Sequence, residues 1–416
     1  MSKAQKARMA ARAALIATFA FAASAAAFAA FAAPARLPAA PARHSAKADE
    51  ADVAKYDSNM AVEGISLEGG IKWIDGKRLP LEGKAFEDVE HFYDRLPINV
   101  TTKVNGGVRA MKHHSAGMQF RFATDSKTLT MEWVPYYGRL AMDHMPSTGV
   151  SGIDIYRFDK AAKKWRYVKT GRITNAKGGK VQLAWTPGEA CLVNLPLYNG
   201  IKSFRLGVDP AAEVKPLGPR ASGVEKPVVF YGTSITHGGC ASRPGNSFVN
   251  MAGRALDVPV VNLGFSGSGV MELEMSEHLA AIDASCYVLD CLWNMGSRAP
   301  DGRRRPGRNV EDNYEPFIRN LREKRPGVPI VMAGQCDVFC GRKDAKEKYV
   351  EGLYRKLVAE GWKDLVYLPN DAMYSGDLEG AVDGVHPNDI GMATMAKAYA
   401  GAVAQALKLP CAEGAR

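Results

Sequence analysis

The chain has 416 residues and a formal net charge of +10; 46% of its residues are hydrophobic and 24% are charged. This length and composition are those of a globular protein with room for two domains, each with a sizeable core. The basic residues are scattered apart from the run at 303–305, and no basic stripe interleaved with aromatic residues lies beside that run, so we expect no nucleic-acid partner.

The N-terminus has the pattern of a secretory signal peptide. A basic start precedes an apolar run at 13–33, and small residues near its end offer cleavage sites. The run is long enough to span a membrane, so an uncleaved anchor is the alternative, but its alanine richness favours cleavage. We assign 1–33 to the signal peptide and 34–60 to an alanine- and proline-rich linker. The mature protein is then expected to be periplasmic or secreted and free of membrane.

Seven cysteines in a chain of this size do not make a disulfide framework. Cys286 and Cys291 lie on a predicted buried strand, and their simplest interpretation is that they are small residues of the core. Cys336 and Cys340 flank a loop, where one disulfide is compatible with an oxidising compartment. No histidine pair at ligand spacing accompanies them, so we expect no metal site here.

Short β-type segments dominate residues 61–210. They alternate with turn signals and leave few helical stretches, which predicts an all-β sandwich. The expected strands cover 117–122, 129–134, 152–158, 165–168, 181–185 and 203–208. The proline-bearing range 211–226 is weakly patterned and is the expected linker to the next domain.

Strands and helices alternate through residues 227–410, which predicts a parallel sheet with helices on both faces. The expected strands cover 228–231, 258–263, 286–292, 328–332 and 365–368. The expected helices cover 247–256, 271–282, 310–324, 344–360 and 389–407.

The first of these strands ends in small and hydroxyl residues, because residues 232–239 read GTSITHGG. Ligands of open α/β sheets bind just beyond the carboxyl ends of the strands, so Ser234 is placed to face a ligand. The alternative is an ordinary strand-to-helix turn with Ser234 or Thr236 as the helix N-cap.

Two more strand ends carry polar or glycine-rich loops. After the second strand, residues 262–269 read NLGFSGSG, whose glycines would bring backbone N–H groups close to a ligand or simply form a flexible turn. A phosphate loop would need a Gly-Lys-Ser/Thr ending or GxGxxG spacing, and neither occurs. After the third strand, the Asn294 amide is placed to donate to an oxyanion or to begin an Asx turn.

An Asp-x-x-His pair precedes the last helix. His386 is a candidate general base, and Asp383 can reach back to fix its tautomer and charge. A lone loop histidine is usually a solvated side chain. Here the pair and Ser234 fall at the same edge of one sheet, which favours a catalytic serine, histidine and aspartate.

Taken together, these blocks resemble the SGNH (GDSL-like) hydrolase family. GTSIT at 232–236 is similar to its first block, with Thr233 where the family name has Asp. NLGFSG at 262–267 is similar to the second block, Asn294 to the third and DGVHP at 383–387 to the fifth. The third block is normally Gly-x-Asn-Asp, whereas residues 292–295 read LWNM.

The resemblance implies roles for individual residues. Ser234 would be the nucleophile, His386 the base and Asp383 its partner. The oxyanion hole would use the N–H groups of Ser234 and Gly267 and the amide of Asn294.

The N-terminal half is similar to a bacterial branch in which a β-sandwich precedes the hydrolase domain. The segments that carry this resemblance are YDRLP at 93–97, SAGM at 115–118, MDHMP at 142–146 and GVSGIDIY at 149–156. It implies a jelly-roll-like sandwich at 61–210 and a flavodoxin-like three-layer α/β hydrolase domain at 227–410. The sandwich would bind carbohydrate or act as a buttress.

Proteins of this architecture include carbohydrate esterases that remove acetyl groups, so the resemblance implies a serine esterase acting on acylated carbohydrate, with no metal or organic cofactor. The alternatives are a lipase or thioesterase, and a catalytically silent carbohydrate-binding protein. Trp293, His144 and His237 are candidate substrate-binding residues. The alternatives are that Trp293 packs in the core, that His144 is a solvated histidine of a surface loop, and that His237 only follows the turn after Ser234. The sequence does not indicate an oligomeric state.

Overall fold

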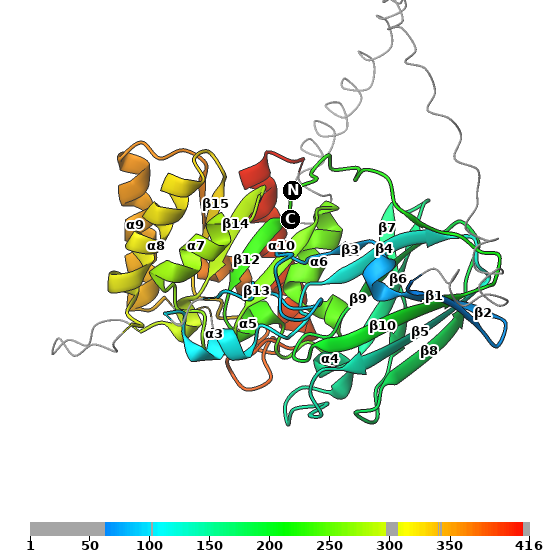
Figure 1. Cartoon of the computed structure of the whole chain (residues 1–416). Helices are drawn as coiled ribbons and strands as arrows, with labels where there is room; N and C mark the ends of the chain where they lie inside the picture. The colour runs from blue at the N-terminus through cyan, green and yellow to red at the C-terminus, as the bar shows by residue number, and fades with distance from the viewer. Residues whose placement is uncertain (1–62, 101–102, 297–306, 340, 342, 411–416) are drawn as a thin grey trace, which may run out of the picture. The chain divides into compact units, whose positions relative to one another are not determined.

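The computed structural model describes residues 63–100, 103–296, 307–339, 341 and 343–410, all of which belong to one compact unit, Lys47–Arg416 (Figure 1). The predicted signal peptide and linker, the basic run at 303–305 and Cys340 lie outside these ranges. Among the described residues, no helix has both the length and the apolar character needed to cross a membrane.

Two antiparallel sheets form the N-terminal half. One has the strand order β1-β2-β10-β5-β8, and the other has the order β11-β4-β9-β6-β7 with β3 beside β4. The strands are β1 (Ile65–Glu68), β2 (Ile71–Asp75), β3 (Leu81–Glu82), β4 (Gln119–Thr124), β5 (Thr128–Pro135), β6 (Ile153–Asp159), β7 (Lys164–Gly171), β8 (Gly179–Ala184), β9 (Ala190–Asn194), β10 (Ile201–Val208) and β11 (Val214–Pro216). The short helices are α3 (Gly106–Ala110) and α4 (Ser147–Val150). β11 falls within the range expected to be a linker and pairs with β4.

The two sheets enclose one core, which makes them a sandwich. Phe120 and Phe122 of β4 alternate inward from one sheet, while Trp133 of β5 and Phe204 of β10 reach in from the other. Alternate residues of a strand point to opposite faces, so the polar residues between them stay outside. The Trp133 indole N–H finds a buried acceptor in the carbonyl of Ser151 at 3.0 Å.

The C-terminal half is a five-stranded parallel sheet with the order β13-β12-β14-β15-β16. This is the flavodoxin-like arrangement, in which the first strand lies between the second and the third. The strands are β12 (Val228–Gly232), β13 (Val260–Gly264), β14 (Cys286–Asp290), β15 (Ile330–Ala333) and β16 (Leu365–Leu368). The helices are α5 (Ser234–His237), α6 (Phe248–Leu256), α7 (Leu273–Ala280), α8 (Val310–Lys324), α9 (Ala345–Ala359) and α10 (Asp389–Leu407).

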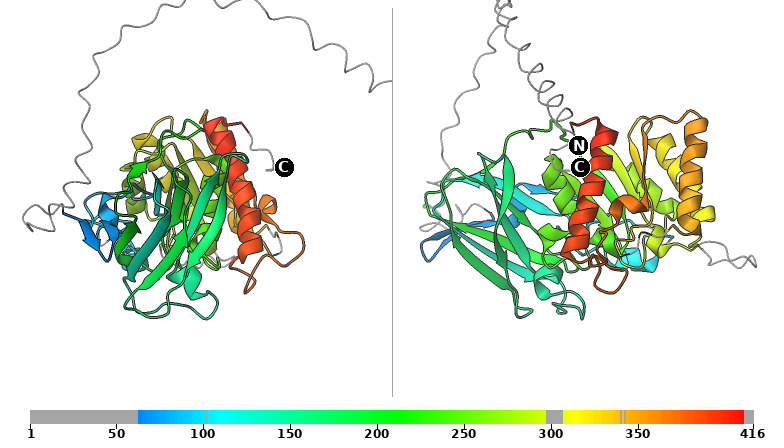
Figure 2. Two further views of the ribbon diagram at one scale, coloured as in Figure 1. Left: turned by 90° about the vertical axis from the view of Figure 1, so that its right-hand side faces the viewer. Right: turned by 180° about the vertical axis from the view of Figure 1, so that it is seen from behind.

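Helices cover both faces of the parallel sheet, α6 and α10 on one and α7, α8 and α9 on the other (Figure 2). Along β12, Val228 and Phe230 pack toward α6 and α10, whereas Val229 and Tyr231 pack toward the other helices. Burial on both faces explains why these strands are continuous apolar runs without alternation. The predicted α/β domain preceded by a β-sandwich is confirmed.

Candidate active site

Ser234 is the first residue of α5, directly after β12. The helix is capped by Thr233, whose side chain accepts from the N–H of Ile235 at 3.2 Å. The hydroxyl of Thr236 in turn accepts from the N–H of Thr233 at 3.2 Å, which completes a capping box. Neither Ser234 nor Thr236 is therefore the N-cap, and the Ser234 hydroxyl is left for another partner.

That partner is His386. The Oγ of Ser234 lies 2.9 Å from Nε2 of His386, and Nδ1 of His386 lies 2.8 Å from Oδ2 of Asp383. The other carboxylate oxygen of Asp383 accepts from the backbone N–H groups of Val385 at 3.0 Å and His386 at 2.7 Å. The carboxylate holds the imidazole with its proton on Nδ1 and its lone pair on Nε2, facing the serine hydroxyl.

The charge of Asp383 is held by its hydrogen bonds. Burial raises the pKa of this carboxyl, but the backbone N–H and imidazole of His386, with the N–H of Val385, outweigh burial and lower the pKa to about 2. Asp383 is therefore ionised at neutral pH. An ionised carboxylate in this position stabilises an imidazolium that forms when His386 takes a proton.

The loop after β13 lies against the end of β12, because the N–H of Phe265 donates to the carbonyl of Gly232 at 2.9 Å. Gly267 in this loop has a φ of +65°, and no heavy atom lies within 4 Å of the position its Cβ would take. Glycine is thus favoured there by the left-handed backbone and not by lack of space. Within the described part of the chain, the backbone N–H groups of Ser234 and Gly267 donate to no protein acceptor.

Asn294 ends the 3-10 helix Leu292–Asn294 and is bound to the same loop. The hydrogen-bond pattern assigns its side-chain oxygen as acceptor of the N–H groups of Ser268 at 3.0 Å and Gly269 at 3.1 Å. In this orientation its NH2 group is not used to bind Ser268 or Gly269.

A buried carboxyl lies behind α5. Asp290 ends β14, is 2% exposed, and accepts from the Thr236 hydroxyl at 2.7 Å. Burial raises its pKa to about 7, against the lowering effect of hydrogen bonds from Thr236, Tyr399 and Cys336. The chemistry of Ser234, His386 and Asp383 does not use this group.

Asp290 is expected to make the protein less stable as the pH rises from about 4 to about 7. In that window the carboxyl is protonated in the folded state and ionised in the unfolded state, so fewer protons are bound after unfolding. The Asp290→Asn variant keeps an acceptor for Thr236 and should lose this contribution. Urea unfolding of both proteins across this range measures it, and parallel curves would contradict the shift.

A guanidinium from the N-terminal half supports the Gly267 loop. Arg95 is 1% exposed and donates to the carbonyls of Gly264 at 2.8 Å, Asn262 at 3.2 Å and Met111 at 3.0 Å. Burial lowers its pKa to about 9, so it remains protonated at neutral pH. Arg95 lies in the YDRLP segment, but no local pattern in the sequence indicates its role.

Tyr198 and His237 pack against each other next to Ser234. The ring of His237 is fully buried and stacks on Tyr198, with centroids 4.1 Å apart, and its Nε2 lies 3.1 Å from Nδ1 of His114. The hydroxyl of Tyr198 donates to the Ser234 carbonyl at 2.8 Å. Burial lowers the pKa of His237 well below its ordinary value, and the positive charge of Arg95 adds to this effect. The His237 side chain is therefore buried inside the protein and does not line the surface of the site.

The other two substrate-binding candidates differ in exposure. His144 is exposed on the loop after β5, and its ring centroid lies 5.7 Å from that of His386. The loop is closed by paired backbone hydrogen bonds between Met142 and Met145 at 3.0 and 3.1 Å. Trp293 is half-buried against the α6/α10 core and donates its indole N–H to the carbonyl of Cys336, which fits the packing role. Cys336 itself is a free, buried thiol.

Comparison with known proteins covers both halves. Residues 225–404 match the model of the GDSL-like Lipase/Acylhydrolase family, and residues 71–214 match the model described as the N-terminus of Esterase_SGNH_hydro-type. No curated protein gives a match.

Several solved structures share the fold. A GDSL-like lipase candidate from Bacteroides ovatus ATCC 8483 is 27% identical with a TM-score of 0.69, and the match covers 82% of this chain and 99% of that one. A salicylyl-acyltransferase from a tetracycline biosynthetic pathway is 16% identical with a TM-score of 0.65, covering 83% and 99%. A family two carbohydrate esterase from Cellvibrio japonicus is 14% identical with a TM-score of 0.52, covering 81% and 98%.

Proposed function

Because the chain belongs to the GDSL-like lipase and acylhydrolase family, we propose that it is a serine esterase that removes small acyl groups, chiefly acetyl, from carbohydrate. The observation that carries the proposal is the continuous hydrogen-bonded row of Ser234, His386 and Asp383. A serine hydroxyl becomes a nucleophile when a positioned base can take its proton, and the base is effective when a third group orients it.

The proposed reaction has two halves. In the first, Ser234 Oγ attacks the ester carbonyl while Nε2 of His386 takes its proton, and the tetrahedral intermediate collapses as the imidazolium protonates the departing sugar alcohol. In the second, His386 takes a proton from water, the resulting hydroxide attacks the acyl-serine, and the proton returns to Ser234 as the carboxylic acid leaves. Asp383 stays ionised throughout and balances the imidazolium.

The oxyanion in both halves would be stabilised by three donors, the backbone N–H groups of Ser234 and Gly267 and the NH2 of Asn294. Such donors stabilise the transition state more than the substrate, because the negative charge develops only there. Arg95 supports the Gly267 loop and Tyr198 supports the start of α5, so the segments that carry two of the three donors need little rearrangement during the reaction.

Asn294→Ala is expected to lower kcat about 10²- to 10³-fold with a smaller change in KM, since one oxyanion donor is lost. Steady-state kinetics on p-nitrophenyl acetate measure both constants. Asn175→Ala, at an exposed loop asparagine of the sandwich, is the matched control. An equal and small effect of both replacements would remove Asn294 from the oxyanion hole.

The carbohydrate part of the proposal is supported by two observations. The fold is shared with a family two carbohydrate esterase. The exposed imidazole of His144 also gives the site a polar group beside His386 that suits a sugar hydroxyl better than a long acyl chain. The rival functions remain a lipase or thioesterase and a silent carbohydrate-binding protein.

Acetate release from a panel of acetylated glycans tests the substrate class, with p-nitrophenyl esters of increasing chain length run beside it. Release from a glycan, with activity falling as the acyl chain lengthens, would support the proposal. Turnover of the small esters without release from any glycan would support the serine mechanism but contradict carbohydrate as the substrate class. Activity rising with chain length would favour a lipase, and binding of glycans without hydrolysis would favour the binding protein.

We also propose that the enzyme works in the periplasm or outside the cell. The proposal rests on the basic and then apolar pattern of residues 1–33. N-terminal sequencing of the protein recovered from fractionated cells tests it, and an intact N-terminus in the membrane fraction would favour an anchor.

A further inference from the structure

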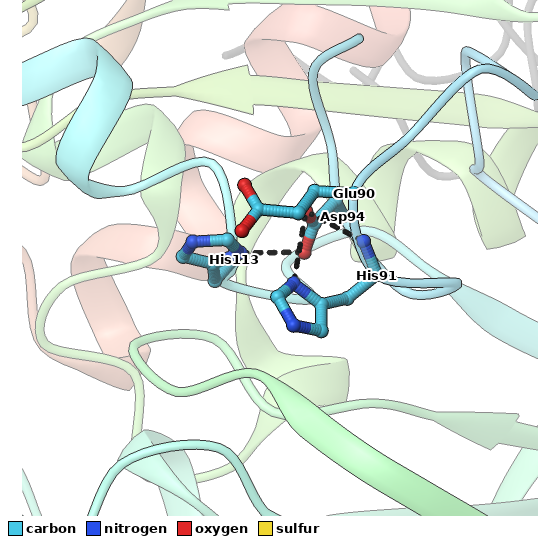
Figure 3. A group of neighbouring side chains, drawn as sticks. All are labelled: Glu90, His91, Asp94 and His113. Atoms are coloured by element: carbon cyan, nitrogen blue, oxygen red, sulfur yellow. Dashed lines mark hydrogen bonds and ion pairs between the residues drawn. The ribbon is translucent and has the colours of Figure 1, made fainter. Parts of the chain in front are cut away.

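Four potential metal ligands lie close together, and none of them is one of the three catalytic candidates. Glu90, His91 and Asp94 lie between β3 and α3, and His113 follows α3. One ligand atom from each of the four residues can be chosen so that all lie within 4.8 Å of one another. Figure 3 shows the two imidazoles and the Glu90 carboxylate gathered around Asp94.

Asp94 is the centre of this cluster. Its Oδ1 lies 2.8 Å from Nδ1 of His113, and its Oδ2 lies 3.7 Å from Nδ1 of His91. The backbone N–H of His91 also donates to Oδ2 at 3.1 Å, which fixes the carboxylate relative to the loop. The Asp94 and His113 side chains are 2% and 13% exposed, whereas those of His91 and Glu90 are 43% and 46% exposed.

The charge of Asp94 lacks a permanent partner. Among the described residues, no lysine or arginine lies within 4.0 Å of its carboxylate, and its ion-pair neighbours are two histidines that are cations only when protonated. The adjacent Arg95 is engaged with backbone carbonyls. A buried carboxylate without a cation is costly, and a metal ion between the carboxylate and the imidazoles would remove that cost.

We propose that Glu90, His91, Asp94 and His113 form a structural binding site for a divalent metal of the zinc class. Two imidazole nitrogens and two carboxylates suit Zn²⁺, whereas Mg²⁺ and Ca²⁺ favour oxygen ligands. Zinc bonds of about 2.0–2.2 Å bring tetrahedral ligand atoms to roughly 3.3–3.6 Å from one another. The exposed side chains of His91 and Glu90 can rotate to close the remaining gap.

Binding requires two local changes. Nδ1 of His113 now faces Asp94, so its lone pair is released to the metal as the ring proton moves to Nε2. Lys112, whose Nζ lies 2.5 Å from Oε2 of Glu90, must give up this carboxylate. The Lys112 ammonium is thus a built-in competitor of the metal, and its removal provides a test with a predicted sign.

The site would be structural because all four donors come from the protein and none belongs to the proposed catalytic machinery. Its neighbours in the chain explain what it would stabilise. Asp94 precedes Arg95, which donates to the Gly264 carbonyl, and His113 precedes His114, which lies 3.1 Å from His237. The metal would join two segments that support the Gly267 and Ser234 loops.

The test uses the full chain without a polyhistidine tag, treated with EDTA and dialysed. Titration with ZnCl2 in a calorimeter should show one equivalent bound, and Zn²⁺ should raise the thermal midpoint while MgCl2 does not. His91→Ala is the main variant because the exposed side chain can be removed without opening the core. It should weaken Zn²⁺ binding at least about tenfold and leave the metal-free thermal midpoint unchanged.

Two control variants accompany His91→Ala, one expected to bind Zn²⁺ more tightly and one expected to bind it unchanged. Lys112→Gln should tighten Zn²⁺ binding, because Glu90 is freed and a positive charge is removed. His144→Ala, at an exposed histidine outside the cluster, should bind Zn²⁺ as the unmodified chain does. Three results would each overturn the proposal: no Zn²⁺ bound by the unmodified chain, equal affinity in His91→Ala and His144→Ala, or weaker binding in Lys112→Gln.

Discussion

Ser234→Ala is expected to lower kcat for ester hydrolysis about 10⁶-fold, the order of magnitude found when a triad nucleophile is removed. The Ser234 hydroxyl is the group held 2.9 Å from Nε2 of His386, and alanine leaves the base without a proton to take. The residue is buried at the start of α5, and Thr233 supplies the cap, so the replacement should not disturb the helix. Burst and steady-state kinetics on p-nitrophenyl acetate measure the loss.

The matched control for this variant is Ser203→Ala, at an exposed serine of β10. Circular dichroism and the thermal midpoint establish that both variants fold. An acyl-enzyme trapped on the unmodified chain should be absent from Ser234→Ala and present in Ser203→Ala. Turnover by Ser234→Ala near that of the unmodified chain would refute the serine mechanism.

His386→Ala should lose a similar factor in kcat, and the double variant Ser234→Ala/His386→Ala should lose no more than either single one. Residues that act as one unit are strongly non-additive, because removing one already abolishes what the other contributes. The three variants are compared by kcat/KM on the same ester. Losses that multiply in the double variant would mean that the two residues act independently, against the hydrogen bond between them.

His144→Ala is the sharpest control for His386, because the two rings lie with centroids 5.7 Å apart. His144 is exposed, and no residue in the described part of the chain orients its imidazole as Asp383 orients His386. Its loss should act mainly on KM for a glycan and much less on kcat for a small ester. A loss of kcat in His144→Ala as large as in His386→Ala would point to a different base.

The parallel half of the fold could be predicted closely because its elements have strong local patterns. The α8 and α10 bounds, Val310–Lys324 and Asp389–Leu407, agree with the predicted ranges, as does β16. The strands of the sandwich were harder to predict. β9 was not predicted because Ala190–Asn194 is buried nearly throughout and shows no alternation of apolar and polar residues. β1 and β2 were not predicted either, and they are short strands near a sheet edge.

Some residues of the candidate active site could be predicted from the sequence, and others could not. Ser234, Asp383 and His386 could be found because each follows a recognisable strand or precedes a recognisable helix, and a parallel sheet brings those loops to one edge. Arg95 and Tyr198 could not be given their positions, because their contacts join segments that are distant in the sequence. Arg95 reaches Gly264, 169 residues further on, and Tyr198 reaches Ser234, 36 residues further on. His237 has the same local pattern as Ser234, and only the packing of Tyr198 shows that its side chain turns inward.

The buried guanidinium of Arg95 has a consequence for the ancestry of this architecture. The hydrolase half obtains part of its scaffold from a residue encoded far upstream, so a recombination event that transferred residues 225–404 alone would deliver a gene fragment lacking one of its own supports. The two halves are then expected to be inherited, duplicated and lost as a pair. A library of chimeras joined near residue 220 should yield active enzymes when the donor of the sandwich also carries an arginine at this position, and few otherwise.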